Sequence, residues 1–318
     1  MRKPIIAVVF ILMATLQSCG QGSNAKKENM NQNIKEKYLN SYKLIKKYDY
    51  NPRFLLDFES YNCTYEILVN DMPALVSFTS GNQGGAIVPV SSNILKSGKQ
   101  DITIRVYPRV DDNDKMDPFL LAHNSGLNIK IKVGDYDKEK QEEYKPLFQY
   151  KMPEVQTGNI PYVEFKGSFE ATVPYQLKGW SQSQDLRKEN KEQLTKEVVA
   201  FYQRYRELLA KGDMDAIAGL LYNREVEVEQ AFFFNKPADA EDTWKRFDEI
   251  RNYHLEMEPL EHYELRFYGD GKAVGLVRTD DELRGESAMV GTSSDGKYRI
   301  YNLILHKPAG SNQLQVIR

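Results

Sequence analysis

The sequence predicts two domains, an antiparallel β-sandwich followed by an α+β domain in which helices precede an antiparallel sheet. The chain has 318 residues, enough for two domains of ordinary size. Between about Pro52 and Pro174, apolar and polar residues alternate, which indicates antiparallel strands covered on one face. From about residue 190, apolar residues recur at helical spacing instead. A polar stretch separates the two patterns, so we expect domains over residues 51–178 and 185–318.

The composition is that of a globular protein and argues against nucleic acid as a partner. Hydrophobic residues make up 41% of the chain, charged residues make up 28%, and the net charge is −2. A nucleic-acid-binding domain calls for a basic stripe or patch, which this charge balance does not provide.

The first nineteen residues have the order of a secretion signal. A basic start and an apolar run over residues 5–16 are followed by a small residue, Ser18, directly before Cys19. The run is shorter than the roughly 20 apolar residues that span a bilayer, which favours a cleaved signal. The stretch Leu16-Gln17-Ser18-Cys19 resembles the lipobox of bacterial lipoproteins. The resemblance implies a signal peptide over residues 1–18, lipid on Cys19, and a membrane-anchored protein on the periplasmic or surface face of the bacterial cell envelope. The alternative is an ordinary secreted protein.

Residues 19–50 are expected to form a lipid-anchored tether that contains an amphipathic helix. The stretch after Cys19 is small and polar, as in a flexible linker. From about residue 31 to 48, apolar residues recur at helical spacing among lysines, namely Ile34, Tyr38, Tyr42 and Ile45. Such a helix packs on a folded domain or touches anionic lipid head groups, and its bulky apolar side favours packing on protein.

The region 51–178 carries the predicted β-sandwich. Its alternating stretches are residues 65–70, 102–107, 127–133 and 169–173, separated by clusters of Gly, Pro, Asn and Asp. The stretch from Ile94 to Tyr107 resembles an element of galactose-binding-like jelly rolls, and Glu66 to Asp71 is similar to the strand before it. In that family the hairpin is scaffold, so the resemblance implies no ligand residue.

Two loops of this region and one cysteine are expected to carry no chemistry. Residues 79–85 are Gly-rich but lack the Gly-Lys-Ser/Thr ending of a phosphate loop. Residues 110–117 are acidic, but Lys115 and Met116 stand where a calcium loop needs a Gly turn, so a solvated turn is favoured over a calcium site. With Cys19 lipidated, Cys63 lacks a disulfide partner and is expected to be a buried thiol. We predict no cofactor and no metal site.

The region 185–318 predicts three helices and then a meander of strands. The first helix carries an apolar face from Leu194 to Leu209 and ends at Gly212, and Asp213 caps the second. A third helix follows Pro237. The expected strands are residues 262–268, 272–278, 287–292 and 297–306, with Asp-Gly turns between several of them.

Three stretches of this region resemble the nuclear transport factor 2-like superfamily. They are Leu209 to Ile217, Tyr268 to Gly275, and Tyr298 to Leu305. The resemblance implies a cone-shaped α+β domain, in which a curved antiparallel sheet wraps a long helix and leaves a pocket. Because the superfamily includes enzymes, ligand binders and inert partner domains, it implies no single activity.

Six residues are candidates for a pocket or partner surface: Phe232, Phe233, Phe234, Trp244, His254 and His262. The aromatic residues either line a groove or fill the core under the sheet, and core filling is favoured. His254 and His262 flank a Glu-rich turn, but the histidines have no metal-binding spacing, and a structural role is favoured over an acid–base pair. No residue is predicted to be catalytic.

We therefore expect a membrane-tethered envelope lipoprotein that binds a protein partner or a small ligand without catalysis, such as an immunity or accessory lipoprotein. One alternative is an envelope enzyme with an acid–base site in the C-terminal pocket. It requires a buried carboxylate beside His254 or His262 and is dropped if both imidazoles face solvent. The other alternative is a carbohydrate-binding accessory protein. It requires exposed aromatic rings beside polar groups on a sheet face or loop rim.

Overall fold

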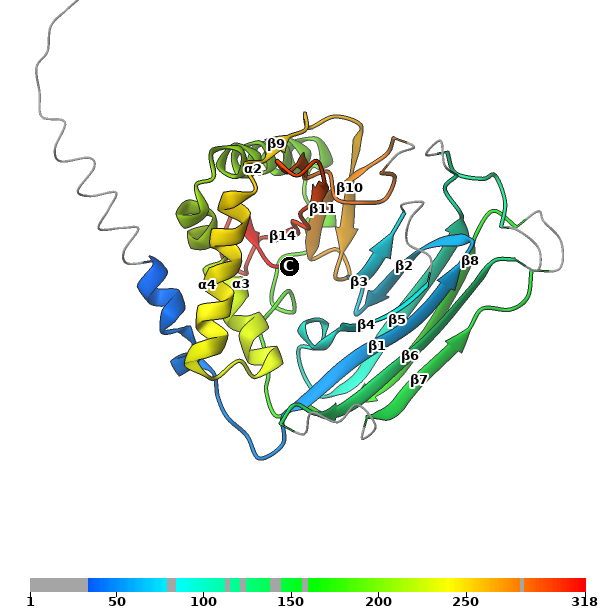
Figure 1. Cartoon of the computed structure of the whole chain (residues 1–318), viewed down its shortest axis with the longest axis horizontal. Coiled ribbons are helices and arrows are strands. Elements are labelled where there is room, and N and C mark those ends of the chain that lie inside the picture. Colours follow the sequence, from blue (N-terminus) through cyan, green and yellow to red (C-terminus); the bar gives the residue numbers. More distant parts are fainter. Residues whose placement is uncertain are drawn as a thin grey trace, which may run out of the picture.

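The computed structural model describes residues 34–78, 84–111, 115–120, 124–137, 144–155, 160–280 and 283–318. Within them the chain forms four sheets of antiparallel strands, and the long helices lie in the C-terminal half (Figure 1). The predicted order of strands, helices and further strands is thus confirmed. Cys19, the signal segment 1–18, His123 and parts of the two loops near residues 80 and 113 lie outside the described residues. In the part of the chain that is described, no helix is long and apolar enough to cross a membrane.

The N-terminal half forms two four-stranded sheets. The first sheet has the order β4 (Gly84–Pro89), β1 (Pro52–Tyr61), β6 (Gly126–Asp135) and β7 (Lys145–Lys151). The second has the order β3 (Met72–Ser77), β2 (Cys63–Val69), β5 (Gly98–Pro108) and β8 (Val163–Ala171), and the 3₁₀ helix η2 (Ser91–Asn93) precedes β5. Apolar side chains of both sheets, such as Leu56, Ile67 and Ile129, form one core cluster. The Cys63 thiol is buried there and donates to the Gly126 carbonyl at 3.3 Å.

Strand β2 departs from the predicted alternation, because it is buried along its whole length. Glu66 and Leu68, expected on an open face, are 1% and 2% exposed. The hairpin of β10 (Tyr263–Tyr268) and β11 (Ala273–Arg278) covers that face: Arg266 reaches Glu66, and Leu68 joins Tyr268 in a small apolar cluster. A strand covered on both faces has no solvent-facing side, so an alternation of apolar and polar residues does not predict its burial.

The three predicted helices form, as α2 (Lys191–Lys211), α3 (Met214–Phe232) and α4 (Pro237–Asn252), and the short 3₁₀ helix η4 (Leu186–Lys188) precedes them. The first two boundaries are as expected, but α4 begins at Pro237 with Lys236 as its N-cap, and not at Asp239 or Asp242. Gly212 ends α2 in the left-handed conformation at φ 64°, and Asp213 accepts a hydrogen bond from the Ala216 N–H at 3.2 Å to start α3.

The C-terminal strands form two small sheets, and a bridge between Val277 of β11 and Ser287 connects them. One has the order β10-β11-β14 (Leu305–His306)-β15 (Gln315–Val316), and the other β13 (Tyr298–Ile300)-β12 (Val290–Thr292)-β9 (Glu256–Met257). The strand expected over residues 297–306 is interrupted at residues 301–304. Backbone hydrogen bonds continue at Tyr301 and Ile304, and two side chains add to them: Tyr202 donates to the Leu303 carbonyl, and Ser287 donates to the Tyr301 carbonyl.

The chain before β1 packs on the C-terminal helices. Residues 34–39 are helical, and the 3₁₀ helix η1 (Ser41–Leu44) follows, beside α4 in Figure 1. Tyr38 is fully buried, and its hydroxyl donates to the Ala218 carbonyl of α3 at 2.9 Å. Its ring contacts Phe247 of α4 in an edge-on arrangement with a centroid separation of 5.1 Å. The apolar side of this segment thus packs on protein, as its bulky residues predict.

Candidate functional site

The aromatic run at the end of α3 divides into one core residue and two surface residues. Phe233 is 1% exposed and belongs to the core of the N-terminal half, where its ring lies 5.7 Å from that of Tyr175. Its φ of 56° turns the chain at the end of α3 and points this side chain away from its neighbours. Phe232 and Phe234 are half-buried and stack on each other at 5.5 Å. Within this aromatic run, Phe233 alone fills a core, and that core belongs to the N-terminal half.

Trp244 lies at a different place, against the segment that precedes β1. Its ring is 5% exposed, lies 5.8 Å from the Tyr38 ring, and has the Lys35 ammonium 5.4 Å above it. A groove of about 650 Å³ runs beside it, lined also by Asp248 and Arg251. Trp244 is thus mainly a core residue with one edge at a surface groove.

His254 and His262 are both exposed, at positive φ values of 48° and 46° that turn the chain. The requirement for an acid–base pair, an imidazole enclosed beside a buried carboxylate, is not met at either position. The six candidate residues therefore lie in separate places and form no single site.

A small cavity lies beside α2, between the C-terminal half and Pro73 and Val76 of β3. Buried side chains of Tyr202 and Tyr268 leave a cavity of about 30 Å³ next to Glu286. That volume holds about one water molecule. A small-molecule site at this place is excluded by size.

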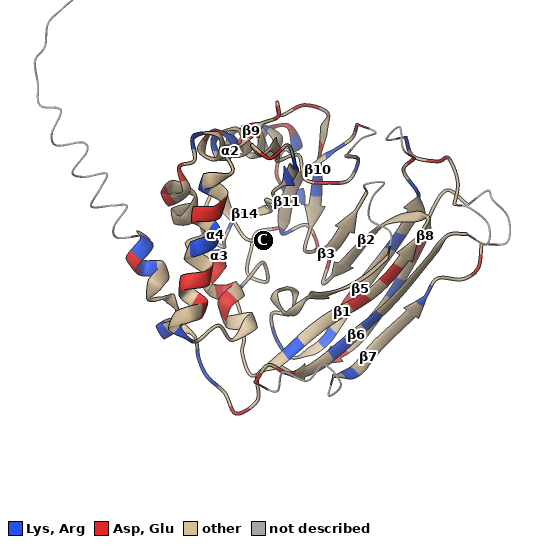
Figure 2. Ribbon diagram, in the orientation of Figure 1, with Lys and Arg blue, Asp and Glu red and all other residues tan. Residues whose placement is uncertain are grey.

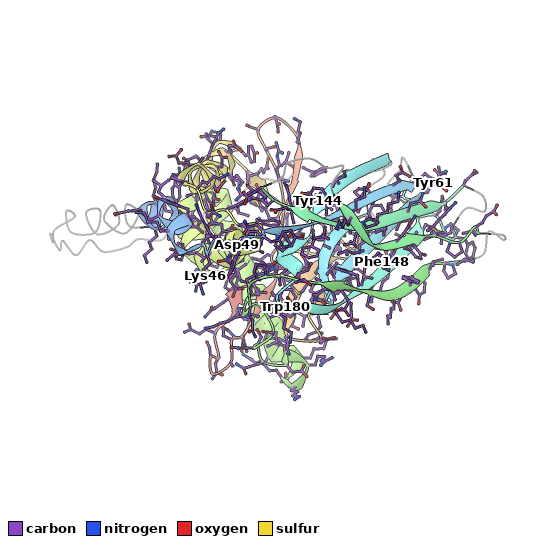
Figure 3. All side chains as sticks on the ribbon, turned by 90° about the horizontal axis from the view of Figure 1, so that it is seen from below. Lys46, Asp49, Tyr61, Tyr144, Phe148 and Trp180 are labelled. Atoms are coloured by element: carbon purple, nitrogen blue, oxygen red, sulfur yellow. The ribbon has the colours of Figure 1, made fainter. Side chains whose placement is uncertain are left out.

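A large cavity opens instead where the two halves meet, and we call it the junction cavity. Its volume is about 630 Å³, in the range of small-molecule sites. Three segments line it: the connection over residues 176–183, the middle of α3, and residues 306–317. Figure 3 labels Trp180, which belongs to the first of these segments and packs in the cluster between the halves.

The polar centre of the junction cavity is the pair Ser183 and His306. The Ser183 hydroxyl lies 2.6 Å from Nδ1 of His306, and the imidazole is buried. Burial, with the positive charge of Arg318 nearby, lowers the pKa of His306 to about 4. The imidazole is therefore neutral at physiological pH and acts as a hydrogen-bonding group rather than a cation.

Charged groups in and behind the cavity wall hold its shape. Glu227 of α3 accepts from the Gly179 N–H at 3.1 Å and lies 3.8 Å from the Arg318 guanidinium. Arg318 also donates to the Ser92 carbonyl at 2.9 Å and lies over the Trp180 ring at 5.1 Å. Burial lowers the pKa of Arg318 to about 10, so it stays charged at neutral pH. These contacts hold the connection over residues 176–183, α3 and Ser92 of the N-terminal half together on one side of the cavity.

Sequence reasoning missed this site because its members are distant along the chain. Ser183 and His306 are 123 residues apart, and neither belongs to a motif. The one local signal was that His306 follows the apolar run Leu303-Ile304-Leu305. Such a position indicates a buried imidazole but does not identify its hydrogen-bond partner.

Among the described residues, no group of three His, Cys, Asp or Glu side chains is placed to hold a metal ion. Comparison with known proteins adds no relative: no protein family, no curated protein and no solved structure matches the chain.

Proposed function

We propose that this protein is a lipid-anchored binding protein of the bacterial cell envelope that takes a small polar ligand in the junction cavity. The observation that carries the proposal is the cavity itself, about 630 Å³ in volume and lined by polar side chains from three distant segments. Ligand sites occur preferentially where domains meet. A small ligand is favoured over a protein partner because the polar groups converge in a hollow rather than on a flat face.

The proposed architecture is a β-sandwich domain followed by a nuclear transport factor 2-like domain. The shared apolar cluster of the first two sheets supports the sandwich, and the packing of α2 against β11 supports the second domain. In this proposal the ligand lies in the junction cavity, because the cavity beside Tyr202 of α2 has a volume of only about 30 Å³.

The lining suggests a ligand that forms many hydrogen bonds. Amides of Gln176, Gln182, Asn223 and Gln315 accompany the Ser183–His306 pair, and Val316 and Ile317 add an apolar patch. Lys178, Arg224 and Glu227 add charges of both signs. Amides and hydroxyls both donate and accept, which suits a polar molecule. Binding without catalysis fits the low basicity of His306, and an enzyme built on His254 and His262 is dropped because both are exposed.

A variant that fills the cavity tests the proposal. Ala309 is exposed and lines the cavity, so Ala309→Trp is expected to block it, whereas Ala210→Trp on the exposed side of α2 is the matched control. Each protein is incubated with a small-molecule extract of the cell envelope, passed through gel filtration and analysed by mass spectrometry. A compound retained by the wild type and the control but lost from Ala309→Trp supports the proposal. No retained compound in the wild type contradicts it.

The anchor needs its own test. Labelling with radioactive palmitate is expected to mark the wild-type protein in the membrane fraction, and Cys19→Ser is expected to carry no label. An unlabelled wild-type protein would show that the lipobox resemblance is misleading, without bearing on the cavity.

A further inference from the structure

A second cavity of about 460 Å³ lies at the end of the first sheet that faces the helical half, and we call it the tyrosine cavity. Arg53, Tyr136, Asp137 and Tyr144 line it from the first sheet, and Lys236 comes from the turn before α4. Figure 3 shows Tyr144 at this end of the sheet and Tyr61, the last residue of β1, at the other. The cavity shares no lining residue with the junction cavity.

Two aromatic rings flank the Arg53 side chain. Arg53 pairs with Gly134 across β1 and β6, and a Cβ atom at Gly134 would come within 2.9 Å of the Tyr144 ring. Glycine therefore allows Tyr144 to lie directly against the strand beside Arg53. The Tyr136 ring lies 5.7 Å from the guanidinium carbon, and Phe234 lies 6.3 Å beyond Tyr136. The half-buried aromatic surface thus continues from the cavity to the end of α3.

The two cations of this cavity form no ion pair with a described carboxylate. Within the described ranges, Arg53 forms no ion pair, and its Nε atom is buried without a hydrogen-bond partner. Lys236 is exposed and also forms no ion pair with any described residue. Elsewhere on this sheet opposite charges lie together, as with Lys132 and Asp57, and Figure 2 shows both signs along β1 and β6. An anionic ligand would supply the charge partner that neither cation has among the described residues.

Asp137 adds an acceptor held in a fixed place. The Asn51 side chain, 4% exposed, donates to Oδ2 of Asp137 at 2.9 Å. A carboxylate in this position repels a compact anion but accepts hydrogen bonds from hydroxyl groups. The cavity therefore suits a ligand that carries an anionic group at one place and hydroxyls at another, with C–H surface to lie against Tyr144 and Ile87.

We propose that the tyrosine cavity binds an anionic saccharide, whose carboxylate pairs with Arg53 and Lys236 while a ring hydroxyl donates to Asp137. Sugar acids combine all three features. This site is independent of the proposed ligand in the junction cavity, so either proposal can fail without the other.

Calorimetric titration with digalacturonic acid tests the site, with the neutral disaccharide galactobiose and inorganic phosphate as comparison probes. The wild-type protein is expected to bind digalacturonic acid at least tenfold more tightly than either comparison probe. Arg53→Gln and Lys236→Gln are each expected to weaken binding about tenfold or more, as for loss of a charged hydrogen bond. Lys151→Gln, an exposed lysine at the far end of β7, is the control and should bind as the wild type does.

Four results would overturn the proposal. They are no binding of digalacturonic acid, equal binding of the neutral disaccharide, equal binding of phosphate, and unchanged affinity in both Gln variants.

Because Arg53 is partly buried, its variant is first compared with the wild type by thermal unfolding. The exposed Lys236 variant keeps the test decisive if Arg53→Gln does not fold. Ala309→Trp, which fills only the junction cavity, should leave the binding of digalacturonic acid unchanged. Loss of this binding in Ala309→Trp would also count against an independent site.

Discussion

Arg266 donates to Glu66 at 2.9 Å, from a strand two hundred residues further along the chain. Glu66 is 1% exposed, and its other oxygen accepts from Arg105 of the neighbouring strand at 2.8 Å. One buried carboxylate thus pairs with two arginines, which also pair with Glu164 and Glu264, and it fastens the β10–β11 hairpin to the second sheet. The contact joins the two halves of the chain.

Glu66→Gln should destabilise the protein strongly. The amide leaves Arg105 and Arg266 without their shared negative charge, and breaking a buried pair lowers the free energy of unfolding by about 3 kcal/mol. Urea unfolding measures the change. Asp101→Asn is the control, because Asp101 pairs with Lys99 in solvent and its loss should cost less than about 0.5 kcal/mol. Equal effects of the two substitutions would contradict the role given to Glu66.

Phe233→Ala should weaken the N-terminal core even though the residue follows a C-terminal helix. Removing a buried phenylalanine costs about 3–5 kcal/mol, and the ring here packs in the cluster of the first two sheets. Phe232→Ala, at a half-buried neighbour, should cost less than half as much. Hydrogen exchange of the β1 and β6 amides reports the core directly. Unchanged protection of these strands in Phe233→Ala would show that the ring does not support them.

Tyr38→Ala should release the segment before β1 from α3 and α4. The substitution removes the buried ring and its hydrogen bond to the Ala218 carbonyl. Trypsin should then cut rapidly at Lys43, Lys46 or Lys47, while the wild type resists. Tyr38→Phe keeps the ring and should lose only about 1 kcal/mol of stability. Equal cleavage rates in the wild type and Tyr38→Ala would rule out a docked segment.

His306 should make the protein less stable as the pH falls from about 6.5 to 4. Its folded pKa of about 4 lies below the ordinary value of 6.5, so the unfolded chain binds the proton more readily in this window. The loss should reach about 3 kcal/mol at pH 4 and be absent above pH 6.5. Urea unfolding of the wild type and of His306→Asn across this range isolates the contribution.

Ser183→Ala tests whether the Ser183 hydroxyl contributes to the lowered pKa of His306. Burial and Arg318, rather than the Ser183 hydroxyl, lower the pKa of His306. The alanine variant should therefore keep the pH dependence of the wild type. A pH dependence that disappears in Ser183→Ala would assign the shift to the hydroxyl instead.

Local signals predicted the helices well because each of them acts within one turn. Asn190 and Asp213 accept hydrogen bonds from backbone N–H groups three residues later, and Gly212 supplies the left-handed turn between α2 and α3. These contacts depend on neighbours in the sequence alone. The alternating stretches located β5 and β6 for the same reason, since a period of two follows from a strand with one covered face. They did not mark β1, β3, β4 or β7.

Long-range packing decided what the local signals could not. The burial of Glu66 and Leu68 depends on a hairpin from the other half, and the Leu303 carbonyl accepts from the distant Tyr202 hydroxyl. Phe233 was identified as a core residue, but the core that it fills belongs to the two sheets of the N-terminal half. Both cavities combine residues from distant segments, so no spacing in the sequence marks them.

By itself, the sequence determined the strand-rich first half, the three capped helices and the turn positions, because backbone geometry and side-chain periodicity are local. It also supports an exported, lipid-anchored protein, which stays a proposal until Cys19 is tested. The tertiary structure alone decided which faces are covered, which imidazole is buried and where space is left. Those properties depend on burial and charge pairing between residues that meet only when the chain is folded.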